Sequence, residues 1–153
     1  MMNLRQRGKL PGALPSLLTA FLLGFVATAA AADKPATHEQ AVRDYVNAYN
    51  ARDLDTMLRL VADDFQWLSI TGDRIAADAN GREALRKSMT AYFNSAAAVR
   101  SNLEWVRASA SRVVALERAT WKTADGERSQ KSLSVYEFRG GLIARVYYFP
   151  AEK

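Results

Sequence analysis

Residues 41 to 69, with the sequence AVRDYVNAYNARDLDTMLRLVADDFQWLS, constrain the fold more than any other stretch of the chain. Apolar residues recur there at spacings of three and four, which predicts two short helices that each have one apolar face. Thr37 precedes the first helix and Asp53 precedes the second, and both residue types cap helix N-termini. From Phe65 to Ile70 apolar and polar residues alternate, which predicts a strand soon after the second helix.

A third helix and four further strands are expected after this stretch. Asn80 followed by Glu83 indicates the start of the third helix. Beyond it the period stays near two, and turn signals at Asp125-Gly126 and Gly140-Gly141 imply antiparallel hairpins. The expected strands are Leu103–Ala108, Arg112–Lys122, Arg128–Arg139 and Leu142–Phe149. The pattern predicts an α+β fold, with three N-terminal helices packed on one face of a curved antiparallel sheet.

The first 32 residues have the pattern of a signal peptide. Arg5, Arg7 and Lys9 precede the apolar run LLTAFLLGFVATAAAA, whose alanines offer A-x-A cleavage sites. This run is shorter than the roughly 20 residues that span a bilayer, so cleavage is favoured over a retained anchor. We expect a periplasmic or secreted protein with no stable membrane insertion, a flexible linker at residues 33 to 36, and one domain at residues 37 to 153.

Charge and composition exclude several classes of function. The chain has 21 basic and 16 acidic residues, and removal of the three basic signal-peptide residues leaves 18 against 16, or +2. A domain this close to neutral lacks the basic surface that binds nucleic acid. The chain has no cysteine, which excludes disulfides and thiol chemistry. Its only histidine is His38, expected at the exposed start of the first helix, so neither a metal nor another cofactor is expected.

Three segments of the chain read YVNAYNARDLDTMLRLVADDFQW, NGREAL and SLSVYEFRGGLIARVYYF. They resemble the nuclear transport factor 2-like superfamily, which includes SnoaL-like polyketide cyclases and ketosteroid isomerases. The resemblance implies a cone-shaped fold whose sheet wraps around a deep pocket, and a homodimer formed through the outer sheet face. It also implies that the connection containing Asp73, Arg74 and Asp78 forms a flap over the pocket mouth.

The ketosteroid isomerase pattern is only partly retained in this sequence. Its oxyanion-binding tyrosine corresponds to Tyr45, whereas its two carboxyl positions correspond to Ser69 and Ser134. A serine without an activating base cannot abstract a proton from carbon near neutral pH. The comparison therefore favours binding of a small, partly apolar organic ligand without catalysis. The alternative is a SnoaL-like lyase, cyclase or isomerase that acts on a small organic molecule.

Six residues are candidates for the ligand-binding pocket: Tyr45, Trp67, Ser69, Arg118, Ser134 and Tyr136. Several of these assignments depend on which face of the strands Arg112–Lys122 and Arg128–Arg139 points into the cone. A shift of one residue along a strand exchanges its two faces. The resemblance places Ser134 and Tyr136 inside, whereas the opposite choice places Leu133 and Val135 inside. Arg118 is either an inward anion-binding group or a surface residue. Trp67 and Tyr45 carry polar tips that a pocket or a structural hydrogen bond could satisfy.

Overall fold

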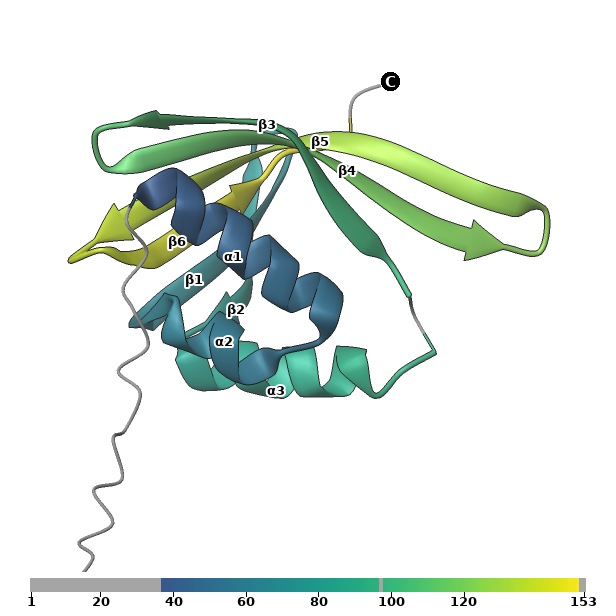
Figure 1. Ribbon diagram of the computed structural model, residues 1–153, viewed down its shortest axis with the longest axis horizontal. Helices are drawn as coiled ribbons and strands as arrows, with labels where there is room; N and C mark the ends of the chain where they lie inside the picture. Colours follow the sequence, from purple (N-terminus) through teal and green to yellow (C-terminus); the bar gives the residue numbers. More distant parts are fainter. Residues whose placement is uncertain (1–36, 97, 152–153) are drawn as a thin grey trace, which may run out of the picture. The chain divides into compact units, whose positions relative to one another are not determined.

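The computed structural model of the protein describes residues 37 to 96 and 98 to 151 (Figure 1). The expected signal peptide and linker lie outside these residues. Within the described residues, no helix is long and apolar enough to cross a membrane. The helices are α1 (His38–Ala51), α2 (Leu54–Arg59) and α3 (Arg82–Phe93). The strands are β1 (Val61–Thr71), β2 (Arg74–Asn80), β3 (Arg100–Ser109), β4 (Arg112–Thr123), β5 (Gly126–Arg139) and β6 (Leu142–Tyr148).

The first two helices begin at the caps that the sequence predicts. The Thr37 hydroxyl accepts a hydrogen bond from the backbone N–H of Gln40 at 3.1 Å, and the Asp53 carboxylate accepts one from Thr56 N at 3.0 Å. Each bond satisfies a backbone donor that has no partner within the helix. The third helix differs from the prediction, because Gly81 rather than Asn80 precedes it and no side chain caps it.

The sheet is mixed, which corrects the expectation of an antiparallel sheet. Its strand order is β2-β1-β6-β5-β4-β3, and β1 pairs with β6 in parallel while the other neighbours are antiparallel. The last strand of the β3–β6 meander returns to the middle of the sheet beside the first strand, and the two run in the same direction. The expected boundaries of the meander strands lie within three residues of the observed ones.

The segment expected to form a flap is strand β2. It forms a hairpin with β1, and Gly72 in the turn has φ of 61°, a conformation that glycine adopts without strain. Strands β1 and β2 lie between α2 and α3, so the helices do not form one N-terminal block. The sequence predicts β1 in this place, and β2 is the additional strand that the structure shows. The sequence of this strand, RIAADAN, shows no alternation of apolar and polar residues, because only Ala79 in it is buried. The strand therefore could not be predicted from the sequence pattern.

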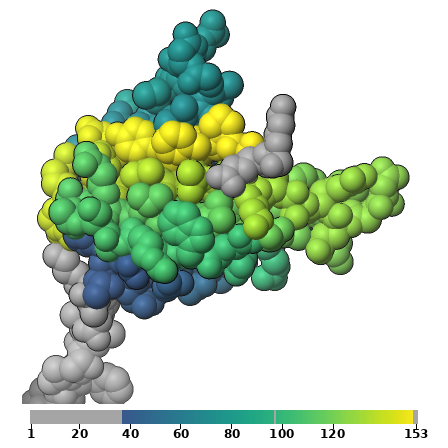
Figure 2. All heavy atoms as spheres, turned by 90° about the horizontal axis from the view of Figure 1, so that it is seen from above, coloured from purple at the N-terminus to yellow at the C-terminus, as the bar shows by residue number. Residues whose placement is uncertain are grey.

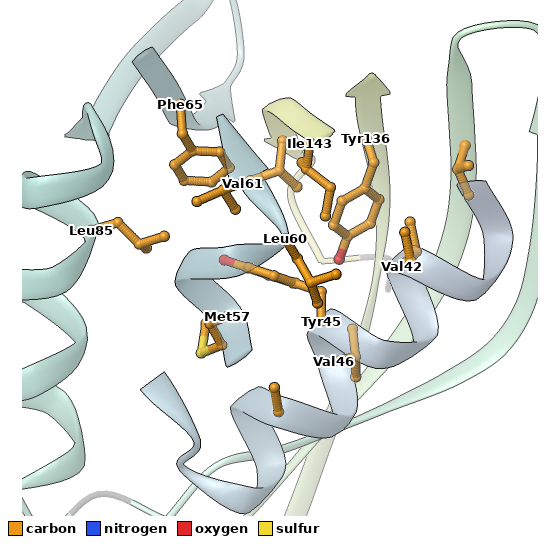
Figure 3. Packing of buried hydrophobic residues seen from close by; sticks show 14 of the residues in the cluster. Val42, Tyr45, Val46, Met57, Leu60, Val61, Phe65, Leu85, Tyr136 and Ile143 are labelled. Atoms are coloured by element: carbon orange, nitrogen blue, oxygen red, sulfur yellow. The ribbon is translucent and has the colours of Figure 1, made fainter. Parts of the chain in front are cut away.

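The helices cover one face of the curved sheet, and the core lies between the two layers (Figure 1). Phe65 from β1, Leu85 from α3 and Tyr136 from β5 are fully buried in this layer. Figure 3 shows Tyr45 of α1 and Tyr136 of β5 with their rings between the helix and the sheet. The layer between α1 and the sheet therefore places polar aromatic side chains among apolar ones, and a cavity opens beside them.

Candidate functional site

A cavity of about 140 Å³ lies between α1 and the inner face of the sheet. Side chains from one helix and four strands, together with Val99 just before β3, surround it: Tyr45, Val46, Tyr49, Trp67, Val99, Ser101, Glu117, Ala119 and Tyr148. Two of the six predicted pocket residues, Tyr45 and Trp67, line it directly. A cavity of about 150 Å³ is known to hold benzene, so this one suits a molecule near the size of a single six-membered ring.

Glu117 is the acidic residue of the cavity, and the sequence interpretation missed it. Its side chain lies on the inner face of β4, and the residue is only 6% exposed. Ser101 Oγ donates to its Oε2 at 2.8 Å. Ser134 Oγ and Tyr136 Oη donate to its Oε1 at 2.5 Å and 2.6 Å. The carboxyl oxygens thus accept three hydrogen bonds, a pattern that suits an ionised carboxylate, which can only accept.

Ser134 and Tyr136 take the inward alternative. Both are fully buried, whereas Leu133 and Val135 between them are partly exposed on the other face of β5. Neither Ser134 nor Tyr136 is a wall of the cavity. They lie behind Glu117 and hold its carboxyl group in place, which is a different role from the predicted contact with a ligand.

The tyrosine hydroxyls around the cavity remain protonated in the folded protein. Burial raises the pKa of Tyr136 well above its ordinary value, and the negative charge of Glu117 raises it further. The same two causes raise the pKa of Tyr148, whose hydroxyl lies 3.2 Å from that of Tyr136. These groups therefore act as hydrogen-bond donors over the whole neutral pH range.

Tyr45 differs from the other tyrosines because its hydroxyl has no hydrogen-bond partner among the described residues, although it is fully buried. Burial, followed by the charge of Glu117, raises the pKa of Tyr45, so the hydroxyl keeps its proton. An unpaired buried donor costs about 1–3 kcal/mol. The Tyr45 side chain also forms part of the cavity wall.

Tyr49 of the cavity wall packs against Tyr92 of α3. Their rings stack with centroids 5.9 Å apart, and the Tyr49 hydroxyl donates to the Tyr92 hydroxyl at 3.0 Å. Tyr92 Oη in turn accepts from the backbone N–H of Val99 at 3.2 Å. These bonds tie Val99, a residue of the cavity wall, to α1 and α3.

Ser69 and Arg118, the other two candidate pocket residues besides Ser134 and Tyr136, do not line this cavity. The Ser69 hydroxyl donates to Asp78 on β2, beyond a register shift between Trp67 and Leu68. Arg118 lies on the outer face of β4, where its guanidinium pairs with Glu104 at 2.5 Å. Successive side chains of a strand point to opposite faces, so the outward position of Arg118 and the inward position of Glu117 follow from each other.

His38 lies outside the cavity, as the sequence interpretation preferred. Its ring stacks on Phe138 with centroids 4.1 Å apart, and its Nδ1 lies 3.1 Å from the carbonyl oxygen of Ala110. Across the described residues, no group of three or more histidines or acids could hold a metal ion.

Comparison with known proteins identifies similar sequences and folds. A family described as the SnoaL-like domain matches residues 42 to 146. None of the curated proteins compared with the chain has a matching sequence.

Three solved structures illustrate the similarity of fold. A cystatin-fold protein from Novosphingobium aromaticivorans is 23% identical with a TM-score of 0.63, and the match covers 72% of this chain and 95% of that protein. Bal32a, from a soil-derived mobile gene cassette, is 25% identical with a TM-score of 0.59 over 71% of this chain and 84% of its own. An epoxide hydrolase from M. tuberculosis is 16% identical with a TM-score of 0.59 over 74% and 81%.

Proposed function

The chain belongs to the SnoaL-like domain family, and from this premise we propose that its cavity binds a small organic molecule and that Glu117 transfers a proton of that molecule. The observation that carries the proposal is the buried carboxyl group of Glu117 in the wall of the cavity. Serines occupy both positions at which the ketosteroid isomerase pattern has carboxyl groups. Glu117 places a carboxyl group in the cavity wall from another position.

The reaction that fits these groups is proton abstraction from a carbon atom next to a carbonyl. Glu117 would remove the proton, and the electron pair of the broken C–H bond would form a carbon–carbon double bond. The carbonyl π electrons would move onto oxygen, and this oxygen would accept a hydrogen bond from the Tyr45 hydroxyl, which has no partner among the described residues. Glu117 would then return the proton to another carbon in an isomerase, or to a departing hydroxyl group in a lyase.

A second candidate is binding without catalysis. It is favoured by the three hydrogen bonds that Glu117 already accepts, because buried polar groups require such partners even where their role is structural. In that case the carboxyl group shapes the cavity, and the Tyr45 hydroxyl alone selects a ligand that carries an acceptor oxygen.

Cyclohex-3-en-1-one tests both candidates, because it has one six-membered ring, a carbonyl and acidic α-hydrogens. We expect the protein to accelerate deuterium exchange and double-bond migration in D₂O, followed by ¹H NMR. Glu117→Gln should reduce the rate by about 10²–10⁴-fold, because it removes the base. Tyr45→Phe should reduce it by about 10²–10³-fold, the effect of removing one donor to a developing oxyanion.

Binding is measured separately by ligand-observed NMR. Glu83→Gln on the exposed surface of α3 is the matched control and should retain the wild-type rate. Binding without exchange, unchanged in Glu117→Gln, would establish the second candidate instead. Absence of both binding and exchange would overturn the proposal.

We also propose that the protein is exported and that its first 32 residues are removed. The support is the order of basic residues, apolar run and alanines in residues 1 to 32. Mass spectrometry of the exported protein should give a new N-terminus at Ala32 or Asp33. Recovery of the chain only in membranes with its first methionines intact would contradict this proposal.

A further inference from the structure

The charge of Glu117 has no counter-ion within the described part of the chain. Glu104 and Glu137 on the outer sheet face each pair with two cationic side chains, although both are more exposed. The partners of Glu117 are three hydroxyl groups, and no lysine, arginine or histidine lines the cavity. Buried charges in proteins are normally paired, because transfer of an isolated ion from water is costly.

Two arginines, Arg52 and Arg100, line the hollow next to the cavity. Arg52 lines a neighbouring hollow together with Tyr49, and its guanidinium donates to the backbone carbonyl of Phe93. Burial raises the pKa of Tyr49, and the positive charge of Arg52 offsets a small part of this increase. The cavity beside Glu117 is therefore acidic and partly closed, which favours a cationic occupant over a neutral or anionic one.

The remaining walls of the cavity suit an organic cation. Tyr45, Tyr49, Trp67 and Tyr148 are four of its nine lining residues, and the rings of Trp67 and Tyr148 lie 5.4 Å apart. Aromatic rings attract ammonium groups through the negative charge of their faces, and this attraction grows where water is excluded. An inorganic cation would instead require several oxygen ligands, and no such cluster of acids is present among the described residues.

We infer that the ligand of this cavity is a small organic ammonium compound that also carries an oxygen atom. The ammonium group lies among the aromatic rings beside Glu117, and the oxygen accepts the hydrogen bond of Tyr45. An amino alcohol, an amino ketone or an N-methylated form of either has this chemistry and the required size. The inference relies on the proposed function only in treating the cavity as a binding site, and it names the class of molecule bound there.

Choline and its neutral carbon isostere 3,3-dimethylbutan-1-ol test the inference, because they differ in charge and have nearly the same shape. Isothermal titration calorimetry should show that the protein binds choline at least about tenfold more tightly than the isostere. Glu117→Gln should remove this difference by weakening choline alone. Glu83→Gln should preserve it, and Trp67→Leu should weaken choline more than the isostere.

Equal affinity for choline and its isostere, or no choline binding at millimolar concentration, would overturn the inference. The proposed proton transfer has a separate readout, namely exchange on cyclohex-3-en-1-one. Exchange without choline binding would remove the ammonium assignment and leave the catalytic proposal in place. Choline binding without exchange would support the ammonium assignment and contradict the catalytic proposal.

Discussion

Tyr136 links the core of the domain to its candidate site at the scale of a single residue. Its ring is fully buried, while its hydroxyl donates to Glu117 and lies near the hydroxyl of Tyr148. Glu117 is thereby held by donors from β3 and β5, the two strands that flank its own strand. The position of the carboxyl group should depend on this network more than on the chain around Glu117.

Removal of the Tyr136 hydroxyl tests the strength of this network. Tyr136→Phe leaves a buried carboxyl oxygen with one donor fewer, and we expect the free energy of unfolding to fall by about 1–3 kcal/mol. Urea denaturation followed by circular dichroism measures the change. Tyr147→Phe is the matched control, because the Tyr147 hydroxyl makes only a long 3.3 Å bond to Glu137 on the outer face. Its removal should lower the free energy of unfolding by less than removal of the Tyr136 hydroxyl. A Tyr136→Phe variant as stable as the wild type would show that the bond to Glu117 is not stabilising.

The buried tyrosines also predict a loss of stability in alkaline solution. In the unfolded chain tyrosine ionises near pH 10, whereas burial raises the pKa values of Tyr45, Tyr136 and Tyr148 in the folded protein. Above pH 10 the folded state therefore binds more protons than the unfolded state, and stability falls as the pH rises. Each tyrosine contributes at most about 1.4 kcal/mol per pH unit. Urea midpoints should be constant below pH 9 or so and should decrease from about pH 10 upward.

A parallel absorbance titration provides the check on this explanation. The tyrosinate absorbance of the buried residues should appear together with unfolding rather than before it. Ionisation of all six tyrosines near pH 10 in a protein that remains folded would contradict the assigned burial.

At the scale of secondary structure, the N-terminal helices could be predicted because their signals are local. The apolar spacing and the caps Thr37 and Asp53 depend only on neighbouring residues, and both caps are present in the structure. The same is true of the meander strands, where alternation and glycine turns mark the boundaries. Strand β2 could not be predicted, because no local sequence pattern indicates it. The parallel pairing of β1 with β6 depends on contacts between residues far apart in the sequence, so it could not be predicted either.

The candidate site is harder to predict than the helices, because whether a strand residue points into the cavity depends on which face of the strand it occupies. A register shift occurs in β3, where Glu104 is the extra residue, so alternation counted from a single reference residue loses track of the face there. At the shift beside Trp67 the extra residue lies in β2, so Ser69 keeps the face of Trp67, but it does not line the cavity. Ser134 lies in a regular part of the β4–β5 pair and takes the inward face that the resemblance implies. Glu117 shares that regular pair. Its inward position follows once Ser134 is known to be buried, because Ala115 is the direct partner of Ser134 and Glu117 lies two residues further along the same face.

The Thr37 cap gives a prediction for the first helix. Thr37→Ala leaves the backbone N–H of Gln40 without its side-chain acceptor, and the free energy of unfolding should fall by about 1 kcal/mol. Thr37→Ser keeps the hydroxyl and should retain most of the stability. Urea denaturation of the three proteins measures the difference, and identical midpoints for alanine and serine would show that α1 does not depend on the cap.

At the scale of the whole domain, an apolar patch lies on the sheet face opposite the helices, the side from which Figure 2 views the molecule. Strand pairing places five partly or largely exposed side chains next to one another on this face: Trp105, Leu116, Leu133, Val135 and Tyr147. Ion pairs centred on Glu104 and Glu137 lie on the same face. An apolar centre with charged groups around it is the composition of a protein–protein interface, whereas a monomer would leave it in contact with water.

We therefore expect the protein to form a homodimer through this outer apolar patch, with the cavities on the opposite sides of the two sheets. Leu133→Lys places a charge at the centre of the patch, where desolvation of an unpaired ammonium would oppose association. Sedimentation equilibrium should give twice the mass of the monomer for the wild type and the mass of the monomer for Leu133→Lys. Gln130→Lys adds the same charge on the other face of β5 and should remain dimeric. A wild-type protein that sediments as a monomer at high micromolar concentration would contradict the dimer. In that case the patch would be covered by a different partner, and the cavity chemistry would be unaffected, because no residue that lines the cavity belongs to the patch.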